Sequence, residues 1–378
     1  MNRHFILSFA PLALVLCSGP AGADEAAKPK VVQVAICLDT SSSMDGLIDS
    51  AKRKLWDVVN DLARAKPTPD LRVALYSYGN NAYDRTAGWV RQEIDLTADL
   101  DRVSEKLSAL KATKVPNSDE YVARVCRDAV ERLKWSDDPK ALKAIFVCGN
   151  ESAEQDPEVK LKAVAEAAVR KGIIINTIYC GNPSDADAPG WKEFARLPEG
   201  RFAAIDQDRG TVTVATPHDK ELAELGARLN GTFCFAGKDA KALAENQRRQ
   251  DENALQLGAP TAASRAESKA GGLYRFDGQD LVERLRQDPK FDIKKVPEAE
   301  LPDQLQKMTP KAREKHVKKL SGEREEIQKK INELATKREA YIQAELKKRP
   351  SATDRAFDEA IRGALRDQAK TKGIDIPK

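Results

Sequence analysis

A short stretch near the start of the chain combines an acid with hydroxyl groups at alternate positions. Asp39, Ser41 and Ser43 lie in the run Asp-Thr-Ser-Ser-Ser. Carboxylate and hydroxyl oxygens are hard ligands, and a small dication such as Mg²⁺ takes near-octahedral oxygen coordination. Because few of these ligands are acids, a bound ion would keep positive charge, and a partner's carboxylate could complete its coordination. The alternative is a helix N-cap cluster, since Asp and Ser commonly precede helices.

The elements around this stretch would decide where it lies. An almost wholly apolar run at residues 31–38 comes directly before it, as expected for a central strand buried on both faces. A helix is expected after it, from about residue 45, with apolar residues recurring at intervals of three and four. In an open α/β sheet, ligands bind beyond the carboxyl ends of strands. The run therefore lies where such a fold would place a binding site.

Apolar runs alternate with helical patterns over residues 30–230, which is typical of a doubly wound α/β domain with a mainly parallel sheet. A further helix is expected at residues 122–133. The strands are expected at residues 31–38, 71–78, 89–96, 142–148, 173–180 and 201–205.

Beyond this domain the sequence indicates a charged α-helical C-terminal region. Helices are expected at residues 218–229 and 239–257, and a stretch rich in Ala, Ser and Gly then suggests a linker. Thr309 and Pro310 suit the start of one tail helix, and Ser351 with Asp354 suits a second. The expected division is 1–23 signal peptide, 30–230 α/β domain, 231–258 helical extension, 259–300 linker and 301–378 helical hairpin or tail.

The first tail helix carries an apolar stripe that charged residues interrupt. A long dimeric coiled coil is therefore disfavoured, and a hairpin with the second helix is favoured. Lysine and arginine outnumber acids here, which indicates either a solvated face or a functional basic patch. The stripe is Leu320, Ile327, Ile331, Leu334 and Tyr341, the interruptions are Arg324, Arg338 and Glu345, and the packing residues of the second helix are Phe357, Ile361, Ala364 and Leu365.

The first 23 residues predict a cleaved secretory signal. Arg3 and His4 precede a short apolar run, and Ala21-Gly22-Ala23 offers the small residues of a cleavage site. We therefore expect an exported protein, either periplasmic or secreted, with no transmembrane segment after cleavage.

An odd number of cysteines would remain in the exported chain. They are Cys37, Cys126, Cys148, Cys180 and Cys234. Buried thiols are favoured, and a disulfide involving Cys180 is a hypothesis. No cysteine and histidine spacing indicates zinc. A net charge of +4 with 32% charged residues does not require nucleic acid as a partner.

The strand followed by Asp39-x-Ser41-x-Ser43 resembles the metal ion-dependent adhesion site (MIDAS) of von Willebrand factor type A (VWA) domains. The resemblance covers about residues 30–230, roughly one domain length, and is strongest to bacterial exported proteins with one such domain and a helical tail. It implies a Rossmann-like fold and a divalent cation, with Mg²⁺ first and Mn²⁺ or Ca²⁺ as alternatives. In the family, a second loop adds a Thr or an Asp, and a third loop adds an acid.

These two further loops depart from the family pattern in this chain. The second loop lies at residues 112–120 and lacks Gly-Gly-Thr; Asp119 is the first choice there, with Thr113 and Ser118 as fallbacks. The third loop reads Cys-Gly-Asn-Glu from residue 148 instead of Thr-Asp-Gly, so the resemblance leaves Glu151 or Asn150 as its ligand.

The resemblance and the loop chemistry together imply an exported, adhesion-type protein-binding module whose metal captures an acidic group of a partner. One alternative is an envelope scaffold that acts mainly through its C-terminal helices. A metal-dependent hydrolase is the other, and it is disfavoured: His218 and His316 lie in no catalytic context, and serine-hydrolase, P-loop and zincin motifs are missing. We therefore expect no enzymatic activity. Oligomeric state is left open.

Overall fold

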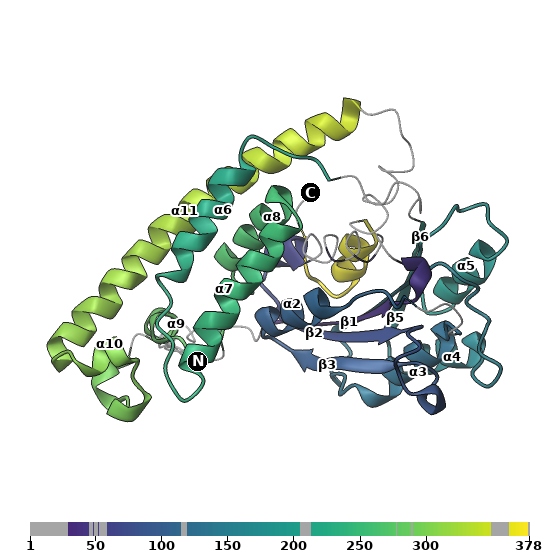
Figure 1. Ribbon diagram of the computed structural model, residues 1–378, viewed down its shortest axis with the longest axis horizontal. Helices are drawn as coiled ribbons and strands as arrows, with labels where there is room; N and C mark the ends of the chain where they lie inside the picture. The colour runs from purple at the N-terminus through teal and green to yellow at the C-terminus, as the bar shows by residue number, and fades with distance from the viewer. Residues whose placement is uncertain are drawn as a thin grey trace, which may run out of the picture.

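The computed structural model describes residues 29–44, 48, 52, 59–114, 119–204, 213–276, 278–288, 290–348 and 363–376. A six-stranded sheet with the order β3-β2-β1-β4-β5-β6 forms its centre (Figure 1). Only the β2–β3 pair is antiparallel among these strands. The α/β fold with a mainly parallel sheet is confirmed. The strands are β1 (Val31–Asp39), β2 (Asp70–Tyr78), β3 (Arg91–Thr97), β4 (Leu142–Gly149), β5 (Ile174–Tyr179) and β6 (Phe202–Ala204).

Helices cover both faces of the sheet. Alternate residues of β1 point to opposite sides, so they belong to two different cores. Val34 and Ile36 share a core with α2 (Leu100–Ala109). Ala35 and Cys37 share the other core with α3 (Val122–Arg132), α4 (Leu161–Arg170) and α5 (Ala188–Arg196). β1 is therefore buried on both sides, as its apolar sequence predicts.

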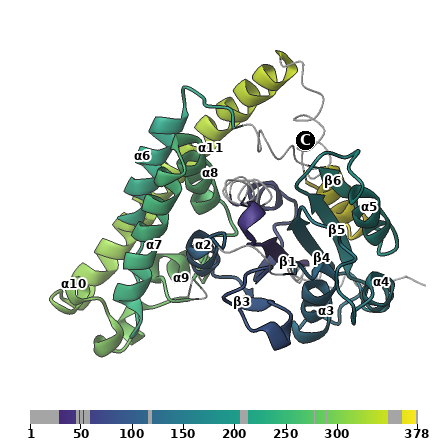
Figure 2. The same cartoon turned by 45° about the vertical axis from the view of Figure 1, so that its right-hand side comes forward.

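A helical layer packs beside this α/β unit. It contains α6 (Asp219–Asn230), α7 (Ala240–Gln256), α8 (Ala259–Ala270), α9 (Leu281–Gln287), α10 (Asp303–Gln306) and α11 (Pro310–Lys348). Figure 2 shows α7 next to α2 on the side of the sheet that faces this layer. The helices expected at 218–229 and 239–257 and the helix start at Pro310 agree with α6, α7 and α11. Within the described part of the chain, no helix is both long and apolar enough to cross a membrane.

The interpretation of residues 259–300 as a linker is wrong. Residues 259–270 form α8, which packs closely on α6: a Cβ at Gly226 would lie 2.7 Å from Ala266 Cβ. Alanine is the best helix former, and small side chains allow two helices to approach closely. The same composition that suggested a flexible segment therefore builds a tight helix contact. Tyr274 and Phe276 then join the sheet's core.

The predicted C-terminal hairpin is also wrong where the structure describes it. Leu365 and Ala369 are fully buried in the core of the sheet, not against α11. Asp375 pairs antiparallel with Lys66 through two backbone hydrogen bonds of 2.8 and 3.1 Å. The end of the chain therefore completes one face of the α/β unit. Phe357 and Ile361 lie outside the described residues, as do Ser351, Asp354 and the expected signal peptide.

The α11 stripe instead packs within the helical layer. Ile327 and Ile331 contact the core formed by α6 and α8, and Leu320 joins the core around α9. Arg324 and Arg338 do not face solvent. They are buried and form ion pairs with Asp280 (2.5 Å) and Asp219 (2.8 Å).

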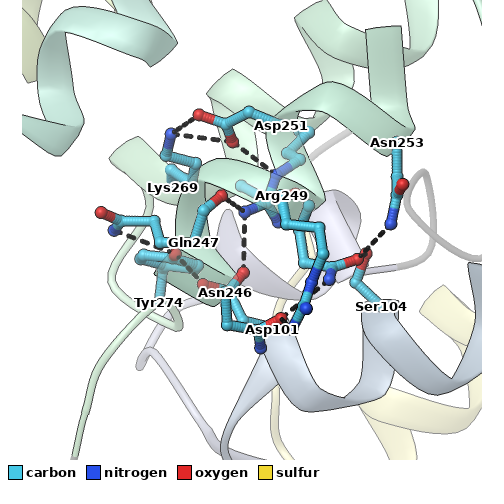
Figure 3. Close-up of polar contacts among 12 residues, drawn as sticks. Asp101, Ser104, Asn246, Gln247, Arg249, Asp251, Asn253, Lys269 and Tyr274 are labelled. Carbon is cyan, nitrogen blue, oxygen red and sulfur yellow. Dashed lines mark hydrogen bonds and ion pairs between the residues drawn. The ribbon is translucent and has the colours of Figure 1, made fainter. Parts of the chain in front are cut away.

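A buried polar network joins the helical layer to the α/β unit (Figure 3). Asp101 of α2 pairs with Arg265 of α8 at 2.8 Å and accepts a hydrogen bond from Tyr274 at 2.5 Å. Asp251 of α7 pairs with Lys269 at 2.7 Å. Burial lowers the pKa of Lys269 to about 8, against the opposing effect of Asp251. These contacts fix the orientation of α7 and α8 against α2.

The five cysteines at positions 37, 126, 148, 180 and 234 are free and buried. The prediction of buried thiols agrees with this, and the disulfide hypothesis for Cys180 does not. For two of them, Cys148 and Cys180, burial raises the pKa of the thiol and so disfavours the reactive thiolate.

Candidate metal site

The first loop begins where β1 ends, at the carboxyl edge of the sheet. Asp39 is fully buried, and its Oδ1 accepts a hydrogen bond of 2.8 Å from the backbone N–H of Ser41. Thr40 donates from its backbone and its hydroxyl to the carbonyl of Tyr78, at 2.9 and 3.0 Å. Ser43 lies in a 3₁₀ turn over Ser42–Met44, and its side chain is outside the described atoms. These hydrogen bonds tie the start of the turn to the end of β2.

A second carboxylate reaches Asp39 from the loop before α3, and it belongs to Glu120. Gly79, at the end of β2, makes room for both: a Cβ there would lie 2.7 Å from Asp39 Oδ1 and 3.0 Å from Glu120 Cγ. Its φ of +70° also favours glycine. Glu120 is 6% exposed. One oxygen of each carboxyl, Asp39 Oδ2 and Glu120 Oε2, is buried without a hydrogen-bond partner.

The two carboxyls cannot both ionise easily in this position. Burial is the main cause that raises the pKa of Asp39 to about 6, while hydrogen bonds from Glu120 and Ser41 oppose the rise. Burial and then the charge of Asp39 raise the pKa of Glu120 to about 10. At neutral pH, protonated Glu120 therefore donates to the Asp39 carboxylate. A proton holds together a pair that a cation could hold instead.

The chemistry of these donors fits a hard divalent cation. Two buried carboxyl oxygens have no partner, and the Ser41 hydroxyl hydrogen-bonds to both carboxyls. Such oxygens are the ligands that Mg²⁺, Mn²⁺ and Ca²⁺ take in proteins. No group of three or more His, Cys, Asp or Glu side chains placed to hold a metal occurs in the part of the chain that is described. An ion here would therefore rely on hydroxyl groups and water as well.

The structure places the predicted second-loop residues differently from the expectation. Asp119 is exposed and accepts a hydrogen bond of 2.9 Å from the Tyr121 hydroxyl, whereas its neighbour Glu120 turns inward. Thr113 does lie beside the first loop, since its backbone N–H donates to the Thr40 carbonyl at 2.9 Å. Its hydroxyl donates to Asn81 at 2.7 Å. Ser118 lies outside the described residues.

Sequence reasoning missed Glu120, although it is adjacent to the residue chosen. Its orientation depends on a distant contact: the Gln155 side chain accepts a hydrogen bond of 2.7 Å from the Glu120 backbone N–H. The only local signal for an inward-facing Glu120 is its position two residues before Val122, the buried first residue of the amphipathic helix α3.

The third loop follows β4 and brings Glu151 towards the same site. The negative charge of Glu151 contributes to the raised pKa of both Asp39 and Glu120. Asn150 is half-exposed between Gly149 and Glu151. Of the predicted set, the structure thus brings together Asp39, Ser41 and the charge of Glu151, and it adds Glu120.

No sequence family and no curated protein matches this chain. Solved structures do. A von Willebrand factor type A protein from Catenulispora acidiphila is 17% identical with a TM-score of 0.35, covering 62% of this chain and 43% of its own. The conserved hypothetical protein BatB from Bacteroides thetaiotaomicron is 15% identical with a TM-score of 0.36, covering 58% of this chain and 99% of its own.

A third similar structure is proximal thread matrix protein 1 from the mussel byssus, described as having a zinc-occupied MIDAS motif. It is 12% identical with a TM-score of 0.38, and the match covers 48% of this chain. The chain spans 43% of the length of that protein. These three similarities are similarities of fold.

Proposed function

We propose that this chain is a cation-dependent protein-binding module, in which a divalent cation is held beside Asp39, Ser41 and Glu120. Ser43 and Glu151 are the proposed further contributors. Mg²⁺ is the first candidate, with Mn²⁺ or Ca²⁺ as alternatives, because the donors are carboxylate and hydroxyl oxygens.

The observation that carries this proposal is the buried carboxyl pair. Asp39 Oδ2 and Glu120 Oε2 are both buried and lack a hydrogen-bond partner. Leaving a buried carboxylate without an ionic partner costs roughly 3–5 kcal/mol of stability. Gly79 leaves room for both carboxyls, and a cation in place of the Glu120 proton would balance both charges and engage the two oxygens that lack a partner.

The proposed partner offers an acidic group. The bound cation would balance Asp39 and Glu120, and an oxygen of the partner would take a coordination position that the protein leaves to water. A carboxylate is the strongest such ligand among protein side chains. We also propose that the chain is exported and that it binds without catalysis.

Titration calorimetry with Mg²⁺ and Mn²⁺ tests the cation site. The wild type should show saturable binding, and Asp39→Ala should abolish it. Asp119→Asn is the matched control, because its carboxylate is exposed and lies next to Glu120. Equal heats for the wild type and Asp39→Ala would refute the proposal.

The acidic partner needs a second experiment with defined probes. A glutamate-rich peptide immobilised on a sensor surface should retain the protein in Mn²⁺ and release it in EDTA. A lysine-rich peptide of the same length is the control. Retention that does not respond to EDTA, or that is equal on both peptides, would contradict capture through the cation.

A further inference from the structure

Three backbone carbonyls at the end of β4 and in the third loop accept hydrogen bonds from the surrounding core; they belong to Cys148, Gly149 and Glu151. The Tyr78 hydroxyl donates to the Cys148 carbonyl at 2.8 Å, and the Cys180 N–H donates to the Gly149 carbonyl at 2.7 Å. The Trp191 indole N–H donates to the Glu151 carbonyl at 2.8 Å. The loop that carries Glu151 is thus fixed by groups of β2, the end of β5 and α5.

Tyr78 connects this loop to the other two. Its backbone carbonyl accepts both hydrogen bonds from Thr40 in the first loop, and it directly precedes Gly79, where Asp39 and Glu120 meet. Its ring is fully buried. One residue therefore sets the spacing of the first loop through its backbone and of the third loop through its hydroxyl.

The packing around the loop leaves little space for movement. A Cβ at Gly149 would lie 2.4 Å from the Tyr78 hydroxyl and 3.0 Å from the Trp191 ring, and Trp191 is fully buried. Loss of the Tyr78 hydroxyl would leave the Cys148 carbonyl without this partner in the core, and loss of the Trp191 N–H would do the same to the half-buried Glu151 carbonyl. The loop would have to shift to recover a partner.

We propose that the Tyr78 hydroxyl and the Trp191 indole N–H are positioning groups that hold Glu151 at the cation site. This inference rests on the proposed cation site and deepens it. Groups that orient the ligands of a metal without touching it typically contribute 10- to 100-fold to metal affinity. Tyr78→Phe should therefore weaken Mn²⁺ binding by roughly 10- to 100-fold.

Tyr76 supplies a matched control on the same strand. It is buried like Tyr78, but its hydroxyl has no hydrogen-bond partner. Tyr76→Phe removes the same atom from the same kind of site and should leave Mn²⁺ affinity unchanged. A loss of affinity in Tyr78→Phe alone would then be specific to the Cys148 contact.

The experiment is a Mn²⁺ titration of the full chain followed by electron paramagnetic resonance, at a temperature where circular dichroism shows each variant folded. The variants are Tyr78→Phe, Trp191→Phe and Tyr76→Phe. Each is also made in a Glu151→Gln background. If Tyr78 acts through Glu151, Tyr78→Phe should lose most of its effect there, because two coupled substitutions are not additive.

The outcomes separate the two proposals. Wild-type protein that does not bind Mn²⁺ would overturn the cation site and this inference with it. Wild-type protein that binds, with Tyr78→Phe and Trp191→Phe matching Tyr76→Phe, would overturn only the positioning role. If Tyr78→Phe does not fold, Trp191→Phe in both backgrounds decides the question in the same way.

Discussion

Glu120→Gln should stabilise the cation-free protein at neutral pH while it destroys the cation site. In the folded protein the pKa of Glu120 is about 10, against an ordinary value of 4.5. The folded chain thus holds a proton there that the unfolded chain releases once the pH exceeds about 4.5. The contribution of Glu120 to stability is therefore complete below that pH and is lost as the pH rises towards 10.

The magnitude follows from the pH interval. Each pH unit above the unfolded pKa costs about 1.36 kcal/mol while only the folded chain is protonated. From pH 4.5 to 7.5 the cost is about 4 kcal/mol, which is an upper figure because the loop can relax. Glutamine has no proton to gain, and its N–H can still donate to Asp39. Glu120→Gln should thus gain up to about 4 kcal/mol at pH 7.5 and close to nothing at pH 4.5.

Urea unfolding in EDTA, followed by circular dichroism at both pH values, measures this difference. Asp119→Asn is the matched control, because it removes an exposed acid one residue away. Saturating Mn²⁺ should reverse the order, since a cation that binds only the folded wild type stabilises it by mass action. The reasoning is refuted if Glu120→Gln is no more stable than Asp119→Asn at pH 7.5 in EDTA.

Three further perturbations test the fold around the site. Gly79→Ala should cost about 1–2 kcal/mol of stability for its left-handed backbone and more for the clash with Asp39. It should also abolish Mn²⁺ binding in calorimetry; near-normal binding would contradict the close approach of Gly79 to Asp39. Arg324→Met should leave the buried Asp280 without its cationic partner and cost about 3–5 kcal/mol in urea unfolding. Substitution of the exposed Lys319 by Met should cost under about 0.5 kcal/mol, and similar values for both variants would argue against the burial of the pair. A chain that stops after Lys348 should lose the cooperative thermal unfolding of the α/β unit; an unchanged melting temperature would mean that residues 363–376 do not belong to its core.

The sheet could be predicted because its signal is local. Val31–Asp39 is apolar at nearly every position, and such a run has few alternatives to a strand covered on both faces. The same run places Asp39 at the carboxyl edge. Fold and first loop therefore follow from neighbouring residues alone.

The partners of the first loop could not be predicted in the same way, because distant residues decide them. Glu120 turns towards Asp39 through a contact with Gln155, 35 positions away. Arg324 looks like a surface charge until Asp280, 44 positions earlier, is placed beside it. A side chain whose role depends on a remote partner carries no local pattern that distinguishes it from its neighbours.

The contact of residues 363–376 with the sheet also has a consequence for the order of synthesis. Lys66 and Asp375 are paired, so the two ends of this one core are made more than 300 positions apart. Chains generally fold by domains as they emerge. Here α2 would cover its part of this face early, while the part that residues 363–376 cover would stay open until the helical layer is complete. During this interval the apolar surface that this segment later buries would need protection from aggregation.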